Sequence, residues 1–284
     1  MGALHQLIPM EEPGDVLSPS SASSYLACGF KWFGRHVLKL PDPPTGALTM
    51  GSAVHAAINA NFEQKIETKR DLPPIGVKAV YDEAWQLMVK GEYPARYQGG
   101  KPSLPTEFRD DEEPGELKKQ GEILALKYLD EACPEIEPQA VEFRVAGTIN
   151  GVRAHGYIDL LDVQGRVIDL KTAARKPSEI SSDYRFQVAT YRQLLGSIVT
   201  GEARVDTLVK TKTPQLTQMS CTIDQSDVAS VPGSGWMRRN SETGGTQAAG
   251  AQKGRFREVG RRAAGRTGDP AGESRHQPTN SWLG

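Results

Sequence analysis

The feature that most constrains the fold is a pair of short apolar runs that carry charges in their centres. Residues 156–173 read GYIDLLDVQGRVIDLKTA, with a glycine between two strand-like segments. Side chains two apart on a strand share a face. The alternation therefore predicts one buried face, formed by Ile158, Leu160, Ile168 and Leu170. It also predicts one charged face, formed by Asp159, Asp169 and Lys171.

Charges at these positions have two interpretations. A carboxylate removed from water costs several kcal/mol unless something compensates it, so these charges either face solvent on an ordinary two-sided sheet or hold a cation. A three-residue loop that ends at a left-handed Gly165 would put Asp159 directly opposite Asp169. A divalent cation would turn the repulsion between facing carboxylates into coordination, and oxygen ligands suit Mg²⁺ or Mn²⁺. Lys171 reaches the same pocket.

The rest of the chain predicts an α/β protein with a helical N-terminal lobe. Ser18 and Pro19 are a typical helix start, followed by one apolar helical face with Leu26, Phe30, Phe33 and Val37. Further helices are expected over about 52–67, 77–89, 117–128 and 183–199, with an exposed loop over 91–115. Strands are expected over 140–149, 152–163, 167–172, 203–211 and 216–223, with turns at Asn150-Gly151 and Gln164-Gly165.

Composition and sequence patterns exclude several classes of protein. Two helices precede any strand, and neither GxGxxG nor GxxxxGK[ST] occurs, so a parallel nucleotide-binding fold has little support. No apolar run approaches the roughly 20 residues of a membrane span, and we expect no membrane partner. Cys28, Cys133 and Cys221 are odd in number and far apart, which favours a reducing, cytoplasmic setting.

Charge is distributed unevenly along the chain. The formal net charge is −1, but residues 232–284 hold nine Lys/Arg against four Asp/Glu. That stretch also has eleven glycines and few large apolar residues, so we expect a disordered Gly/Arg-rich tail. Residues 1–16 are expected to be a flexible leader. The folded domain is then 17–231, with a mainly helical lobe over 17–135 and a sheet and helix over 139–223.

The acidic-x-Lys triplet at Asp169 and Lys171 is informative because of its context. Four such triplets occur, and the other three lie on predicted helices, where a spacing of two does not bring side chains together. The triplet at Asp169 lies on a predicted strand beside a second buried acid.

Five segments in order resemble the PD-(D/E)XK nuclease superfamily, in its RecB-like branch, which includes the CRISPR-adaptation exonucleases. They cover roughly residues 17–222 and read LSPSSASSYLACGFKWFGRHVL (17–38), MGSAVHAAI (50–58), GYIDLLD, VIDLKT and FQVATYRQLL (186–195). The resemblance implies a restriction-endonuclease-like core, that is, a mixed sheet with an antiparallel hairpin and flanking helices.

The resemblance also implies roles for individual residues. Metal ligands would be His55, Asp159, Asp169 and the backbone carbonyl of Leu170. Lys171 would be catalytic, and Gln187 and Tyr191 would be either substrate-side polar groups or helix-packing residues. Glu142 could join the acidic cluster, whereas His155 is expected to be structural.

The implied activity is Mg²⁺- or Mn²⁺-dependent hydrolysis of DNA, as an exonuclease on single-stranded ends. Roles in DNA repair, recombination, phage or CRISPR-type processing would follow, with helicase or CRISPR-adaptation partners. The alternative is a non-catalytic nucleic-acid-binding remnant of such a nuclease.

The sequence departs from the resemblance at the iron–sulfur cluster that part of this branch carries. That cluster takes one cysteine near the N-terminus and three near the C-terminus. Cys28 matches the first position, but the other three are missing, so we expect no cluster and interpret Cys28 as a stranded ligand or a small buried residue.

Overall fold

The computed structural model describes residues 17–94, 104–149, 151–224 and 227. The predicted leader 1–16 and tail 232–284 lie outside the described residues, as does Asn150 of the first predicted turn. None of the helices in the described part of the chain combines the length and apolar character needed to cross a bilayer.

The N-terminal lobe is helical, as expected. Its helices are α1 (Pro19–Ala27), α2 (Gly29–His36), α3 (Gly46–Thr68), α4 (Pro74–Lys90) and α5 (Pro114–Glu131). The side chain of Ser18 caps α1 by accepting from the Ser21 amide, and Pro19 is the first helical residue. The Glu112 carboxylate accepts from the first two amides of α3, which extends that helix six residues before its predicted start.

A mixed five-stranded sheet follows in the order β1-β2-β3-β4-β5. Its strands are β1 (Pro138–Ile149), β2 (Val152–Asp162), β3 (Val167–Ala173), β4 (Glu202–Val209) and β5 (Gln215–Thr222). Helix α6 (Ser182–Leu195) connects β3 to β4, and this crossover makes the two strands parallel. The other neighbours are antiparallel. The fold is therefore the predicted restriction-endonuclease-like α/β core.

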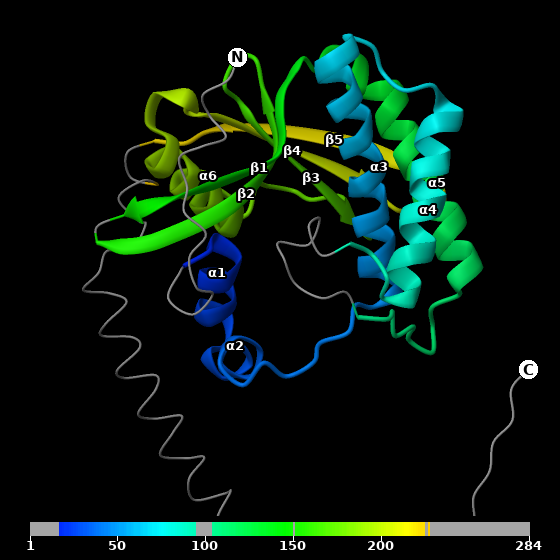
Figure 1. Ribbon diagram of the computed structural model, residues 1–284, viewed down its shortest axis with the longest axis horizontal. Coiled ribbons are helices and arrows are strands. Elements are labelled where there is room, and N and C mark those ends of the chain that lie inside the picture. The colour runs from blue at the N-terminus through cyan, green and yellow to red at the C-terminus, as the bar shows by residue number, and fades with distance from the viewer. Residues whose placement is uncertain (1–16, 95–103, 150, 225–226, 228–284) are drawn as a thin grey trace, which may run out of the picture. The chain divides into compact units, whose positions relative to one another are not determined.

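Helices cover both faces of the sheet (Figure 1). Helices α3, α4 and α5 pack on one face, where Leu160, Ile168, Leu170 and Leu208 join their apolar cluster. Helices α1 and α6 pack on the other face, over Val145, Ile158, Leu161 and Val205. Burial of these side chains stabilises the fold by roughly 25 cal/mol per Å² of apolar surface.

The single helix predicted after Ser18 is wrong. Cys28 is extended (φ −163°, ψ 102°) and separates α1 from α2. The predicted apolar face is not buried either, because Leu26, Phe30 and Val37 are 63%, 71% and 51% exposed. Gly29, directly after Cys28, weakens helix propensity at this point, which is consistent with a break there.

The predicted four-residue buried face of the hairpin is also wrong in one respect. All four aliphatic residues are buried, but Ile158 packs beneath α6, whereas Leu160 packs beneath α3 to α5. The pairs Val141–Leu160 and Phe143–Ile158 flank this change of face, and between them Glu142 has φ +46°. Because Glu142 is left-handed, side chains on β1 no longer alternate regularly between the two faces of the sheet at this point. The residues of β2 that pair with this part of β1 change face in the same way.

Candidate active site

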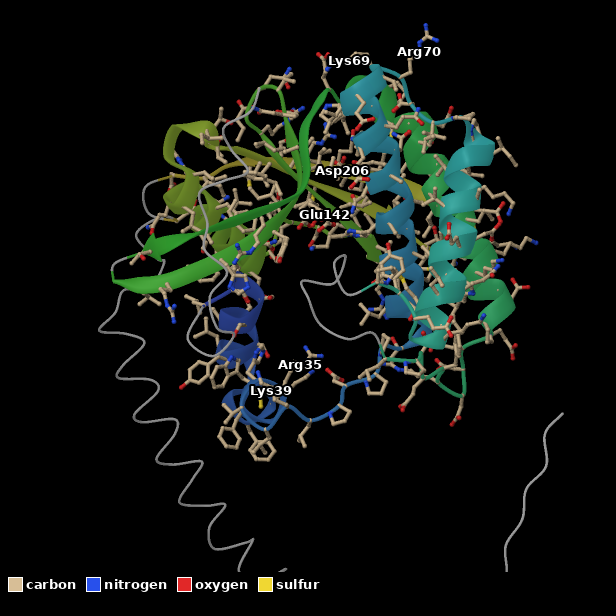
Figure 2. The ribbon with its side chains drawn as sticks, viewed as in Figure 1. Arg35, Lys39, Lys69, Arg70, Glu142 and Asp206 are labelled. Carbon is tan, nitrogen blue, oxygen red and sulfur yellow. The ribbon has the colours of Figure 1, made fainter. Side chains whose placement is uncertain are left out.

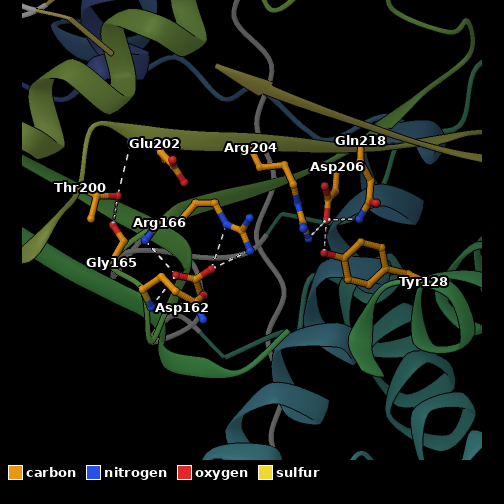
Figure 3. A network of polar contacts seen from close by, with 10 residues as sticks. Tyr128, Asp162, Gly165, Arg166, Thr200, Glu202, Arg204, Asp206 and Gln218 are labelled. Atoms are coloured by element: carbon orange, nitrogen blue, oxygen red, sulfur yellow. Dashed lines mark hydrogen bonds and ion pairs between the residues drawn. The ribbon is translucent and has the colours of Figure 1, made fainter. Parts of the chain in front are cut away.

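The turn between β2 and β3 sets the register of the hairpin. Leu160 pairs with Ile168, and Leu161 pairs with Val167. Gly165 has φ +75°, the left-handed conformation that was predicted for it. The buried Asp162 carboxylate closes the turn by accepting from the Gln164 and Arg166 amides and from Arg166 Nε (Figure 3). The ladder ends at Leu160–Ile168, and Asp159 and Asp169 are the next residues along the two strands in this register.

At Asp159 a side-chain hydrogen bond to β3 replaces the backbone hydrogen bonds of the ladder. Its Oδ2 accepts from the Leu170 amide at 3.2 Å. The same oxygen lies 3.8 Å from Nδ1 of His55, which comes from α3. The Asp159 side chain keeps 20% exposure, so it is recessed but still reachable from the surface.

Helix α3 reaches this end of the sheet because of Gly51. A Cβ on Gly51 would lie 2.7 Å from the Thr172 hydroxyl oxygen, closer than real contacts allow. The glycine therefore lets α3 lie directly against β3, and His55 follows one helical turn later on the same face. This contact gives the Gly-x-x-x-His spacing a physical reason.

Asp169 and Lys171 form an ion pair on β3. Lys171 Nζ lies 2.8 Å from Oδ2 of Asp169 and donates to Oδ1 at 3.1 Å. The Asp169 carboxyl is almost fully buried, whereas the Lys171 side chain is 51% exposed. Oδ2 of Asp169 is inaccessible to solvent and has no well-angled hydrogen bond among the described residues. Such an atom is a candidate ligand position.

Burial perturbs every titratable group of this cluster. It raises the pKa of Asp159 and of Asp169, and the Asp159 carboxylate raises the pKa of Asp169 further. Burial, reinforced by the Lys171 charge, lowers the pKa of His55 to about 4. Burial also lowers the pKa of Lys171, but the carboxylates of Asp169 and Asp159 outweigh it and raise the net value. At neutral pH, His55 is therefore an uncharged imidazole beside a charged lysine.

A cavity of about 1120 Å³ opens beside this cluster. Its lining includes His55, Glu142 and Lys171, together with residues of α3, α4 and the segment that precedes α3. Asp159 and Asp169 are not among the residues that line it. Lys171 and His55 are thus the groups that a molecule in the cavity would meet first.

Glu142 is the third carboxylate at this place, and Figure 2 shows it beside α3. Its Oε1 accepts from Asn59 Nδ2 of α3 at 2.6 Å. Burial, and then the Asp159 carboxylate, raise the pKa of Glu142 to about 7. From the sequence, Glu142 was only a possible member of the acidic cluster, and Asn59 was not identified. Asn59 lies four residues after His55, a spacing that could have indicated a shared helix face.

Gln187 and Tyr191 lie on α6 and bond each other. Gln187 Nε2 donates to the Tyr191 hydroxyl at 2.8 Å, and that hydroxyl donates to the Tyr157 carbonyl at 2.6 Å. Tyr191 is 3% exposed. The pair therefore anchors α6 to β2 two residues before Asp159, and neither residue is in the cavity lining.

The remaining candidates lie apart from this cluster. His155 is on β2, where its amide donates to the Leu17 carbonyl and its ring meets Tyr157 edge-on. Cys28 is exposed between α1 and α2, Cys133 is buried after α5, and Cys221 is on β5.

The types of ligand atom present suit a hard divalent cation. Asp159, Asp169, His55 and the Leu170 carbonyl offer oxygen and neutral imidazole ligands, and Oδ2 of Asp169 is buried with Lys171 Nζ as its ion-pair partner. The ligands are not assembled, however. Within the described residues, no three His, Cys, Asp or Glu side chains converge as a metal cluster does. Lys171 instead holds the carboxylate of Asp169.

A second buried polar cluster, missed by sequence analysis, lies on β4 (Figure 3). Oδ2 of Asp206 accepts from the Tyr128 hydroxyl at 2.7 Å and from Arg204 at 2.8 Å. Gln218 donates to the same oxygen at 3.3 Å. Asp206 is fully buried beneath α5, so this cluster ties that helix to the sheet.

Comparison with solved structures supports the same fold through the first of the following two matches. The crystal structure of a "Putative exonuclease" from Eubacterium rectale superposes with a TM-score of 0.50 at 14% identity, covering 76% of this chain and 75% of that one. The structure of SSO0001 gives a TM-score of 0.28 at 11% identity, covering 69% and 76%. A search of the curated proteins finds no match.

Comparison with protein families gives the assignment. The family model of the PD-(D/E)XK nuclease superfamily matches residues 16–262. Membership implies a hydrolase of the nuclease class, a nucleic-acid substrate and the use of divalent metal that is general in this family. The matched range includes every strand, α6 and the cluster around Asp159 and Asp169. The chain belongs to the PD-(D/E)XK nuclease superfamily.

Proposed function

We propose that this protein is a Mg²⁺- or Mn²⁺-dependent deoxyribonuclease that removes nucleotides from single-stranded DNA ends. One observation carries the proposal: two carboxylates from neighbouring strands lie beside a neutral histidine and a charged lysine that both line one cavity. This combination can bind a divalent cation and a phosphodiester together.

Each residue of the cluster has a proposed role. Asp159, Asp169, His55 and the Leu170 carbonyl would hold the cation, which when bound supplies a nucleophilic water and offsets charge on the phosphate. Lys171 reaches the cavity and would orient the attacking water or stabilise the charge that develops on the phosphate. Gln187 and Tyr191 would position β2 through the Tyr157 carbonyl.

The exonuclease and the RecB-like parts of the proposal have separate support. The E. rectale protein that shares the fold is described as an exonuclease. The RecB-like part is supported by the Gly51 contact, which brings α3 onto β3, and by the 3.8 Å between His55 and Asp159, because the resemblance assigns His55 the role of additional metal ligand. A place in DNA repair, recombination, phage or CRISPR-type processing, with helicase or CRISPR-adaptation partners, rests on that branch.

A non-catalytic nucleic-acid-binding remnant is the second candidate. It is favoured by the absence, among the described residues, of a group of three assembled ligands, and by the ion pair that occupies Asp169.

The test is a titration of Mg²⁺ and of Mn²⁺ on DNA labelled at either end, single-stranded or duplex. We expect metal-dependent release of short products from single strands, abolished in Asp169→Ala and unchanged in Arg70→Gln, an exposed residue after α3. Binding without cleavage at any metal concentration would overturn the nuclease and support the remnant. Internal cuts in circular single strands would overturn the exonuclease assignment.

A further inference from the structure

Helix α2 leaves its apolar side chains uncovered by the rest of the described chain. None of its eight residues is buried. Phe30 is 71% exposed, and Leu26 at the end of α1 is 63% exposed. Val37, Leu38 and Leu40, just after α2, are also exposed. An apolar surface of this kind on a protein of this class indicates a binding site.

The surface is held in place. Trp32 of α2 meets Tyr25 of α1 edge-on at 5.4 Å, and its ring nitrogen donates to Ser21 at 2.8 Å. Leu17, just before α1, exchanges backbone hydrogen bonds with β2 at Arg153 and His155. Phe30 is therefore presented from a fixed platform, which lowers the entropic cost of binding.

Residues 17–41, which we name the basic aromatic hairpin, contain no acid. They carry Lys31, Arg35 and Lys39 with four aromatic residues, whereas residues 1–231 have a net charge of −6. Arg35 is paired with Asp42, so Lys31 and Lys39 supply the positive charge at this surface. Figure 2 shows Arg35 and Lys39 at α2, and Lys69 and Arg70 at the far end of α3.

The hairpin leads directly to the active-site cavity. Asp42 and Pro44, the residues that follow it, line the same cavity as His55 and Lys171. The basic aromatic hairpin is therefore joined, along the chain, to a segment that lines this cavity.

We propose that the basic aromatic hairpin is a docking surface for single-stranded DNA. Phosphates would meet Lys31 and Lys39, and an unstacked base would stack on Phe30. Duplex DNA keeps its bases stacked and cannot use Phe30 in this way. A path from the hairpin into the cavity rests on the proposed nuclease function, but the docking surface itself does not.

The test measures binding in EDTA, where no cleavage occurs, by fluorescence anisotropy of a labelled oligo(dT). Phe30→Ala is compared with Ile75→Ala, a matched control that is 72% exposed on α4. The double variant Lys31→Gln/Lys39→Gln is compared with Arg70→Gln. Circular dichroism and thermal melting verify that each variant is folded.

We expect Phe30→Ala to weaken binding about five- to one-hundred-fold, while Ile75→Ala binds as the wild type does. The double variant should make the negative slope of log K against log salt shallower by about 1.4, since each phosphate contact on a single strand contributes about −0.7. Equal losses for the hairpin and control variants, or equal losses on duplex and single strands, would overturn the proposal.

The outcome is separable from that of the proposed function. Wild-type protein that binds single strands through Phe30 but never cleaves them would retain the docking surface and refute the nuclease. Wild-type protein that cleaves single strands while the hairpin variants bind and cleave normally would do the reverse. A switch from monomer to dimer that Phe30→Ala abolishes, with DNA binding unchanged, would assign the surface to a second copy and overturn the proposal.

Discussion

Neighbouring strands β3 and β4 each contain an ion pair, but the two pairs differ in their exposure. Each has an acid and a base two residues apart, Asp169 with Lys171 on β3 and Arg204 with Asp206 on β4. On β4 the pair is sealed, because Arg204 is 10% exposed and Tyr128 and Gln218 add two donors to Asp206. On β3 the lysine is half exposed and faces a cavity.

The difference shows what separates a structural ion pair from a catalytic candidate. A buried pair with added donors fixes the packing even though Oδ1 of Asp206 and Nε of Arg204 have no hydrogen bond among the described residues, and removing one partner leaves an uncompensated charge. A pair that opens on a cavity can exchange its partner for a ligand at little cost. The residue types are the same, so the surroundings decide the role.

The largest effect is expected from Asp169→Ala. Cleavage of single-stranded DNA should fall on the order of a thousand-fold or more, because the variant lacks a proposed metal ligand. The free energy of unfolding without metal should stay within about 1 kcal/mol of the wild type, since the loss of repulsion with Asp159 offsets the loss of the half-exposed Lys171 partner. Labelled-oligonucleotide assays and urea unfolding measure the two quantities. Cleavage above a tenth of the wild-type rate would remove Asp169 from the site.

Asp206→Ala should lower stability and leave cleavage unchanged, the opposite of Asp169→Ala. Its free energy of unfolding should fall by about 3–5 kcal/mol, because Arg204 is left buried without a counter-charge. Cleavage per folded molecule, measured well below the melting transition, should be retained. If Asp206→Ala were stable but inactive, the distinction between the two strands would fail.

Glu142→Gln tests the electrostatic cost of the open cluster in EDTA. The folded-state pKa of Glu142, about 7, lies above its ordinary value of 4.5, so the folded protein binds more protons between these pH values and its stability falls as pH rises. The variant keeps an acceptor for Asn59 but cannot ionise. Relative to wild type it should therefore gain about 1–3 kcal/mol from pH 4.5 to pH 7.

Urea unfolding of both proteins at several pH values gives this difference, in which the contribution of His55 cancels. A difference that does not change with pH would mean that Glu142 ionises normally in the folded protein.

The smallest effect is expected from Tyr191→Phe. The variant lacks the hydrogen bond to the Tyr157 carbonyl, so its free energy of unfolding should fall by about 1–2 kcal/mol. Its cleavage rate should stay within about threefold of the wild type, because the hydroxyl is turned towards β2. A loss of cleavage greater than tenfold at unchanged stability would show that Tyr191 acts on the substrate.

Sequence patterns predicted the elements, the hairpin register and Gly165 because these features depend on local alternation and turn chemistry. The change of face at Ile158 was not predictable, because it follows from the left-handed conformation of Glu142 on the neighbouring strand. The break at Cys28 was missed because the apolar spacing continues through it, and the exposure of Phe30 was missed because periodicity alone does not distinguish an exposed face from a buried one.

The polar cluster on β4 could have been suspected from the sequence. Asp206 interrupts an apolar strand just as Asp159 does, and the same question about a buried charge applied to it. Its partners Tyr128 and Gln218 come from α5 and β5, which sequence distance conceals. The roles proposed for His55, Asp159, Asp169 and Lys171 remain predictions for the assays above.

The short ladder between β2 and β3 has a mechanical consequence. These strands pair at Leu160–Ile168 and Leu161–Val167, whereas β3 pairs with β4 along its whole length, from Val167 to Ala173. The strands therefore form two well-paired blocks, β1–β2 and β3–β5, that meet along a seam of two residue pairs. Asp159 belongs to the first block and Asp169 to the second. A cation bound by both would cross-link the seam, so loading the site would also tighten the sheet that builds it.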